Sequence, residues 1–278
     1  MRDGCGRRVD QLRVSVTPQC ELRCTYCRPH RHVATDRRPL SDEHRLEFIR
    51  FLHERWDLSQ VRITGGEPLC HPSLVSLVAS LRDAMPAVSI AVTTNGRLLR
   101  RYAAALRQAG LARLNVSVDS LDPRTYRRIT GGDLEPVQAG LDAAEEAGFP
   151  PPKVNTVVLR GLNDKEVPSL ARWALTHGRE IRFLEAMPIG PAAESNRQRF
   201  VSGDEVLGLL EAEFDLTALA GRPEGTARRY RAIGNGCTGV VGLIKPVSEP
   251  FCVGCGRIRL TADGRLYPCL LDPTCVDI

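Results

Sequence analysis

Long hydrophobic runs are missing from this 278-residue chain. Nothing in it approaches the roughly 20 consecutive apolar residues that a membrane-spanning helix requires, which excludes a transmembrane protein. The first ten residues are polar and charged and contain no apolar segment of the kind found in secretory signals. We therefore expect a cytoplasmic protein with no membrane partner.

Lysine is also scarce. Only Lys153, Lys165 and Lys245 occur among the 38 basic residues, so the others are arginine. This excess reflects either the base composition of the genome or a need for bidentate contacts to phosphate and carboxylate groups. The net charge of +5 is spread along the chain without a dense basic run, so the sequence does not indicate a nucleic-acid partner.

The ten cysteines are too few for a scaffold built from disulfide bonds. Because no export signal is visible, we do not expect disulfides. Clustered cysteines in such a chain indicate a metal site or catalysis instead. Six of the ten fall into two groups of three.

Short β-branched runs alternate with longer amphipathic stretches in the first two thirds of the chain. The runs predict strands at residues 12–17, 60–64, 88–93, 113–118, 153–159 and 180–185, and the stretches predict helices at 41–55, 72–84, 98–109, 134–147 and 164–177. Ser41 is placed to cap the first helix. Strand–helix units in series require parallel strands joined by right-handed crossovers. The predicted class is α/β, a partial or full β/α barrel with its chemistry at the carboxyl ends of the strands.

The alternation fades after residue 188. We expect a loop at 190–199, a helix at 202–214, and short antiparallel strands at 228–233, at 240–244 and on both sides of the Asp263-Gly264 turn. The sequence thus predicts two domains, a barrel at 1–190 and a small α+β module at 191–278.

The first cysteine group is Cys20, Cys24 and Cys27, spaced C-x3-C-x2-C directly after the first predicted strand. Zinc held by three cysteines usually takes a fourth protein ligand, for which His30 or His32 is available. An iron–sulfur cluster of four irons held by three cysteines keeps one iron open for a substrate or cofactor. The spacing alone allows a cluster, zinc or no metal.

The second group is Cys252, Cys255 and Cys269, spaced C-x2-C-x13-C in the C-terminal module. It fits a small domain stabilised by zinc. It also fits a second cluster with an open iron, and Cys275 is available as a fourth ligand.

The segment around the first group, with Tyr26 before its last cysteine, resembles the signature of radical S-adenosylmethionine enzymes. Gly65, Gly66, Glu67 and Pro68 follow the second predicted strand, where that family has its glycine-rich motif. The resemblance implies that the first three cysteines hold a 4Fe–4S cluster whose open iron binds the amino and carboxylate groups of S-adenosylmethionine. It also places the glycine-rich loop against that amino group, where glycine permits a close backbone approach.

Further segments are similar to the GTP 3′,8-cyclases of molybdenum-cofactor biosynthesis. They include residues 12–17, 62–69, 93–96, 115–119, 153–155, 180–183 and 251–264, and the similarity runs from about residue 10 to 271. The fold that it implies is a partial six-unit radical S-adenosylmethionine barrel with a C-terminal module that carries a second 4Fe–4S cluster.

The resemblance to the cyclases also assigns roles to individual residues. It implies cofactor contacts at Tyr26, Gly65, Gly66, Glu67, Ser117 and Met187, nucleotide contacts at Arg13, Arg62, Thr93, Lys153, Arg182, Arg257 and Arg259, and ligation of the second cluster by Cys252, Cys255 and Cys269. For Arg182 a structural ion pair is the alternative. The reaction implied begins when a 5′-deoxyadenosyl radical takes hydrogen from C3′ of GTP, and ends with a C3′–C8 bond. An electron donor such as flavodoxin or ferredoxin is implied, and a homodimer is allowed.

Two departures from the cyclases keep other substrates in view. Gln60 stands where the cyclases usually carry a lysine, and the chain ends nine residues after Cys269, without their Gly-Gly tail. One alternative is a related radical enzyme that acts on another nucleoside or sugar nucleotide. The other is a non-catalytic protein whose cysteines bind metal for structure.

Overall fold

The computed structural model describes residues 6–27, 38–220 and 226–278. Cys5, His30 and His32 lie outside these ranges, and so does the proposal of a histidine ligand for the first cysteine group. None of the helices in the described ranges is both long and apolar enough to cross a membrane.

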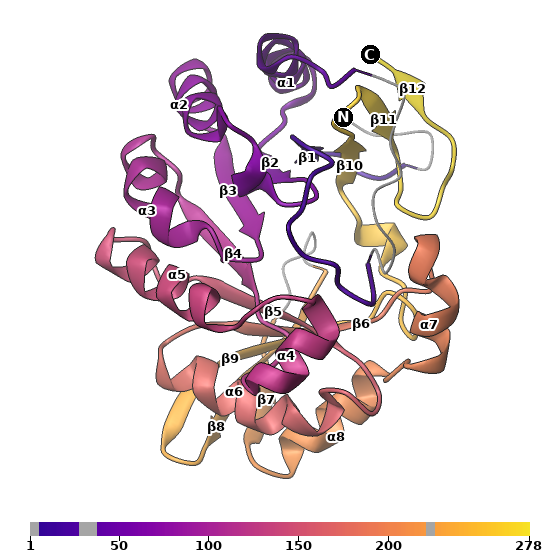
Figure 1. The fold of residues 1–278 in the computed structure, drawn as a ribbon. Helices are drawn as coiled ribbons and strands as arrows, with labels where there is room; N and C mark the ends of the chain where they lie inside the picture. The colour runs from indigo at the N-terminus through magenta and orange to yellow at the C-terminus, as the bar shows by residue number, and fades with distance from the viewer. Residues whose placement is uncertain (1–5, 28–37, 221–225) are drawn as a thin grey trace.

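Twelve strands of the described residues form one sheet in the order β12-β11-β10-β1-β2-β3-β4-β5-β6-β9-β8-β7. Strands β1 to β6 are parallel neighbours, and helices cover the outer face of this part of the sheet (Figure 1). The strands are β1 (Gln11–Ser15), β2 (Gln60–Thr64), β3 (Ser89–Thr94), β4 (Arg113–Ser117), β5 (Lys153–Val158), β6 (Ile181–Glu185), β7 (Asp215–Ala218), β8 (Arg228–Gly234), β9 (Cys237–Ile244), β10 (Arg257–Leu260), β11 (Arg265–Tyr267) and β12 (Val276–Asp277).

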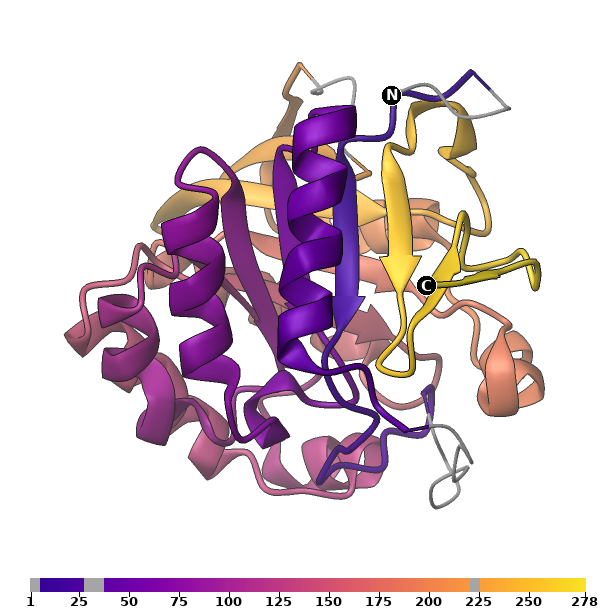
Figure 2. The same ribbon diagram turned by 90° about the horizontal axis from the view of Figure 1, so that it is seen from above.

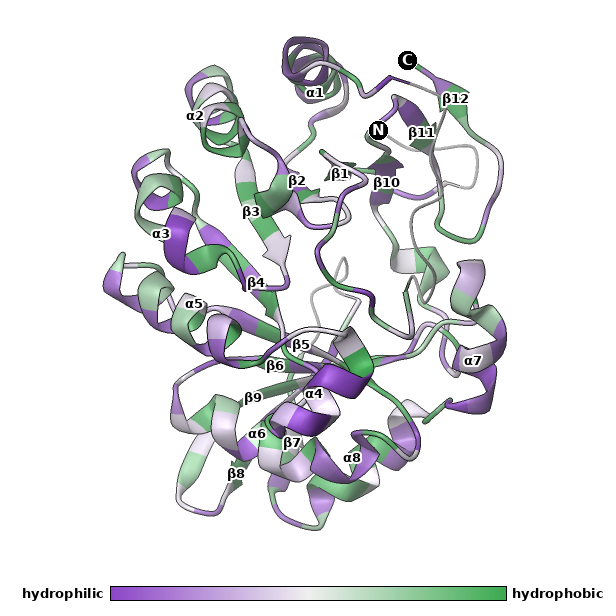
Figure 3. Ribbon diagram, in the orientation of Figure 1, coloured by the Kyte–Doolittle hydropathy of each residue, from purple (hydrophilic) through white to green (hydrophobic). Residues whose placement is uncertain are grey.

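The predicted alternation of strands and helices is confirmed. The helices are α1 (Asp42–Trp56), α2 (Leu74–Ala84), α3 (Leu99–Gln108), α4 (Pro123–Thr130), α5 (Glu135–Glu146), α6 (Val167–Thr176), α7 (Ala193–Gln198) and α8 (Gly203–Glu211). Ser41 caps α1 by accepting a hydrogen bond from the backbone N–H of His44 at 3.2 Å. Hydrophilic and hydrophobic residues alternate along helices such as α3 and α4 (Figure 3), as expected for helices with one buried face.

Two helices were not predicted. Residues 123–130 form α4, which begins where the Asp122 side chain accepts from the N–H of Arg124 and ends at Gly131 with φ +74°. The expected loop at 190–199 is wrong, because residues 193–198 form α7 after a short 3-10 turn. Glu194 pairs there with Arg197 and Gln198 one turn on.

The C-terminal strands extend the sheet at both edges. Strand β9 pairs in parallel with β6 and continues into the antiparallel strands β8 and β7. Strand β10 pairs in parallel with β1, and Figure 2 shows the two side by side with the same direction. The hairpin at Asp263-Gly264 is confirmed, since β10 and β11 are antiparallel and Gly264 has φ +83°.

The strand pattern decides which side chains point into the barrel. In β1 the buried Leu12 and Val14 belong to the same core as Ile49 of α1, while the residues between them are only half-buried. Successive side chains of a strand face opposite sides, so Arg13 lies on the inner face. The strand register sets Arg13 beside Arg259 of β10 and Arg62 of β2.

Candidate active site

The cysteine loop, residues 16–27, is held by two neighbouring segments, the glycine-rich loop and helix α4. The N–H of Gly66 donates to Thr17 O at 2.7 Å, and the N–H of Glu67 donates to Gln19 O at 2.6 Å. Its far end is tied to the last turn of α4, where Thr25 N–H donates to Ile129 O at 2.8 Å. The unpredicted helix therefore helps to shape the loop that carries Cys20, Cys24 and Cys27.

The thiols of this loop lie close enough to influence one another. Burial is the main cause that raises the pKa of Cys20 to about 11 and the pKa of Cys24 well above its usual range. For Cys24 the charges of Asp119, Cys27 and Cys20 raise the pKa further. Among the described residues, no three His, Cys, Asp or Glu side chains are grouped as ligands of a single metal ion. A group of thiolates in such a place needs a cationic centre to offset its charge.

The glycine-rich loop needs Gly65 and Gly66 because the cysteine loop packs directly against their backbone. A Cβ at Gly66 would lie 2.3 Å from Gln19 O, and one at Gly65 would lie 2.8 Å from Thr17 O. No side chain fits at these distances, so glycine lets the two loops pack backbone to backbone. This contact is a reason for the Gly-Gly pair that the sequence did not reveal.

The second cysteine group and most of the expected nucleotide residues line one cavity of about 200 Å³. Its lining includes Cys252, Cys255, Cys269, Arg13, Arg62, Thr93, Arg182, Arg257, Arg259 and Met187. Burial, followed by the charges of Arg259, Arg62 and Arg257, holds the pKa of Arg13 well below its usual range. Concentrated positive charge of this kind is costly unless an anion binds there.

An adjoining cavity of about 210 Å³ shares Arg62, Arg182 and Arg257 with the first and adds Lys153 and Gln60. Several of its lining residues stand at or near the amino ends of their strands, as Lys153 does in β5 and Gln60 in β2. These side chains therefore lie toward the other end of the strands from the carboxyl ends, where the chemistry is expected. Arg182 lines both cavities and pairs with Glu180 at 2.7 Å, so the expected ion pair is present and the expected nucleotide contact stays a prediction.

Known protein families match this chain in two parts, each of which contains one of the two cysteine groups. Residues 14–174 match the model of the radical SAM superfamily, and residues 179–278 match the family described as Molybdenum Cofactor Synthesis C. The chain is 42% identical to the GTP 3′,8-cyclase of Streptomyces coelicolor, over 96% of this chain and 80% of that protein. It is 41% identical to GTP 3′,8-cyclase 1 of Pseudomonas aeruginosa, over 96% of this chain and 82% of that protein. The chain belongs to the GTP 3′,8-cyclase family of radical S-adenosylmethionine enzymes.

Solved structures show the same fold at low sequence identity. Streptococcus suis SuiB bound to its precursor peptide SuiA covers 97% of this chain with a TM-score of 0.70 and 13% identity, and the match covers 62% of SuiB. Family membership sets aside the non-catalytic alternative. This chain is a radical S-adenosylmethionine enzyme whose cofactors are two 4Fe–4S clusters and S-adenosylmethionine.

In this cyclase-family chain, Tyr26 belongs to a buried network that the sequence did not predict. Its hydroxyl donates to Asp119 Oδ2 at 2.8 Å, and Asp119 Oδ1 accepts from Val157 N–H at 2.9 Å. Burial raises the pKa of Asp119 to about 6 and that of Tyr26 well above its usual range. Asn196 of α7 donates to both Tyr26 O (3.0 Å) and Met187 O (2.8 Å), so it joins two expected cofactor contacts.

Cys275 follows the last cysteine of the second group by six residues. Its thiol forms a hydrogen bond with the Tyr267 hydroxyl, which raises the pKa of Tyr267. Cys275 is not among the residues that line the cavity with Cys252, Cys255 and Cys269.

Ser117, another expected cofactor contact, ends β4 at the carboxyl edge of the sheet, in register with Asn155.

Glu67 is the buried acid of the glycine-rich loop. Its Oε1 accepts from Thr94 Oγ1 at 2.6 Å and from Leu69 N–H at 3.0 Å, and its Oε2 accepts from Asn95 N–H at 2.7 Å. Burial raises its pKa to about 7, although these three donors favour the charged form. Glu67 therefore links the glycine-rich loop to the carboxyl end of β3 through hydrogen bonds.

We expect Glu67 to make the protein less stable as the pH rises from about 5 to 8. Its carboxyl titrates near 4.5 in the unfolded chain and at about 7 in the folded protein. The stabilising contribution of the protonated form is therefore complete below about 4.5 and is lost as the pH rises through about 7. A pKa difference of this size corresponds to about 3 kcal/mol. Chemical unfolding of wild type and Glu67→Gln across this range measures it, and parallel pH profiles would contradict the assignment.

Proposed function

We propose that this enzyme converts GTP to 3′,8-cyclo-GTP. The observation that carries the proposal is the arginine-lined cavity that also contains the second cysteine group. Six arginines line it, namely Arg7 and the five expected nucleotide contacts Arg13, Arg62, Arg182, Arg257 and Arg259. This arrangement suits a ligand that has a polyanionic end and a base with ring nitrogens able to meet a metal centre.

The proposed roles at the carboxyl ends of the strands concern cofactor binding. Cys20, Cys24 and Cys27 hold the first cluster, and Tyr26, Gly65, Gly66, Glu67, Ser117 and Met187 surround S-adenosylmethionine. When bound, these groups supply the one-electron chemistry that removes a hydrogen atom from the substrate. The protein's own contribution is to fix the loop backbones, exclude water and orient C3′ of the nucleotide.

The proposed roles inside the barrel concern the substrate. Cys252, Cys255 and Cys269 hold the second cluster beside the purine, and Arg257 and Arg259 lie on the strand that follows it. Thr93, Lys153 and the five arginines bind the ribose and phosphates. In this arrangement the strand register that sets Arg13 between Arg259 and Arg62 gives the phosphate oxygens a row of bidentate donors.

The proposal is tested with the reduced enzyme, S-adenosylmethionine and a panel of nucleotides, by mass spectrometry of 5′-deoxyadenosine and nucleotide products. GTP is expected to accelerate cofactor cleavage and to be consumed. If another nucleoside or sugar nucleotide is consumed while GTP is not, the related-enzyme alternative holds. Arg259→Ala is expected to weaken GTP binding by about tenfold to a hundredfold. Cleavage without nucleotide should be unchanged in this variant, and Arg231→Ala, at an exposed position of β8 that lines neither cavity, is the control.

An electron donor such as flavodoxin or ferredoxin and a homodimer stay predictions from the family resemblance. A cytoplasmic location stays a prediction from the sequence.

A further inference from the structure

The second cavity carries more positive charge than the expected nucleotide residues account for. Its lining includes the cations Arg62, Arg113, Lys153, Arg182, Arg229 and Arg257. Among the described residues, the carboxylate that forms ion pairs with members of this group is Glu180, which pairs with Lys153, Arg182 and Arg229. One carboxylate cannot offset six cations, so the cavity is suited to an anion with several negative charges.

The sheet register turns Arg229 toward this cavity. Arg229 of β8 is in register with Gly242 of β9, which is in register with Arg182 of β6. Residues in register project from the same face of a sheet. Because Gly242 has no side chain, the stem of Arg182 packs over it, and a Cβ there would lie 3.2 Å from Arg182 Cγ.

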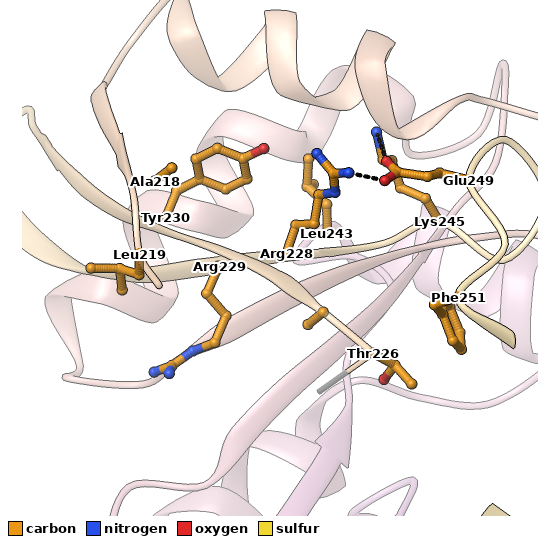
Figure 4. A pocket seen from close by; sticks show the side chains of 11 residues that line it. Ala218, Leu219, Thr226, Arg228, Arg229, Tyr230, Leu243, Lys245, Glu249 and Phe251 are labelled. Carbon is orange, nitrogen blue, oxygen red and sulfur yellow. Dashed lines mark hydrogen bonds and ion pairs between the residues drawn. The ribbon is translucent and has the colours of Figure 1, made fainter. Parts of the chain in front are cut away.

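The neighbouring arginine on the same strand has the opposite orientation. Arg228 points to the other side of β8 and pairs with Glu249, which also pairs with Lys245 at 2.8 Å (Figure 4). In the same view Arg229 points away from that cluster.

The guanidinium group of Arg229 has hydrogen-bonding capacity to spare. Its Nε is buried and has no hydrogen-bond partner within the described part of the chain. Its Nη2 lies 3.5 Å from Glu180 Oε2, which is long for a hydrogen bond. A guanidinium held in this way can reorient its donors toward phosphate oxygens at little cost.

We propose that Arg229 and Arg113 form the subsite for the terminal phosphate of a nucleoside triphosphate. Arg62, Arg182 and Arg257 are shared with the cysteine-lined cavity. A nucleotide whose base lies near the second cysteine group therefore runs its phosphates past these three arginines and ends beside Arg113 and Arg229. The inference rests on the proposed function in taking the ligand to be a nucleotide, and it makes Arg229 the residue that distinguishes a triphosphate from a monophosphate.

Equilibrium binding of GTP, GDP, GMP and inorganic tripolyphosphate to the cluster-loaded enzyme tests this subsite. Arg229→Gln is expected to weaken GTP and tripolyphosphate binding by about tenfold to a hundredfold and to leave GMP binding unchanged. Arg113→Gln, at an exposed position at the start of β4, should weaken binding of the same two ligands. It tests the subsite independently if Arg229→Gln does not fold. Arg228→Gln is the matched control and should bind all four ligands as the wild type does.

An equal loss of GTP and GMP binding in Arg229→Gln would overturn the subsite, and so would unchanged GTP binding in both variants. These outcomes are separate from the fate of the proposed function. If the wild type binds triphosphates through Arg229 but does not cyclise GTP, the subsite stands and the cyclase proposal falls.

Discussion

Replacement of Cys24 by alanine is expected to abolish 5′-deoxyadenosine formation and to remove about half of the bound iron, since each cluster depends on three cysteines. Cys24 is the middle ligand of the proposed first cluster, and its thiol is affected by the charges of both Cys20 and Cys27. Two thiols on this loop cannot replace three, because the loop is fixed by backbone bonds to the glycine-rich loop and to α4. Iron analysis and mass spectrometry provide the two measurements.

Two other cysteines make this experiment specific. Cys237 lies on β9, where its thiol donates to Gly234 O at 3.2 Å, so Cys237→Ser should retain all the iron and full activity. Cys255→Ala should remove the other half of the iron but retain cofactor cleavage in the absence of nucleotide. If Cys24→Ala keeps its full iron content, Cys24 is not a ligand and the assignment of the first group is wrong.

The strands of the barrel could be predicted because their signal is local. The run 60–64 matches β2 at both ends, and the other five barrel strands differ by one or two residues. Each run is β-branched, buried on one face and followed by an amphipathic stretch, which together leave little choice of structure. Helix α4 was missed because its eight residues have little apolar content, and it depends on the Asp122 cap and on contacts with the cysteine loop.

The pairing of distant strands could not be predicted in the same way. Arg13 and Arg259 are in register although they lie at opposite ends of the chain. The local hydrophobic pattern of a sequence does not indicate which strands pair across such a separation. The resemblance supplied these arginines as nucleotide contacts, whereas Arg229 became visible only through the β6–β9–β8 register.

Replacement of Gly66 by alanine is expected to lower cofactor cleavage by about a hundredfold or more, as misplacement of reacting groups by about 1 Å can do. The added Cβ would lie 2.3 Å from Gln19 O and 2.7 Å from Pro18 O. Both contacts are with backbone, so neither neighbour can rotate away. The cysteine loop must shift as a unit, and Cys20 follows Gln19 directly. Overpacking of this kind also costs about 1–3 kcal/mol of stability.

The control is Gly208→Ala in α8, where an added Cβ meets nothing within 4 Å. This change should retain activity and stabilise the protein by up to about 1 kcal/mol, because alanine favours the helix over glycine. The comparison separates loop geometry from a general effect of removing glycine. If Gly66→Ala cleaves S-adenosylmethionine at the wild-type rate while losing stability, the two loops pack for folding alone. If it loses cleavage but keeps its iron, the contact between Gly66 and Gln19 is what places the cofactor against the first cluster.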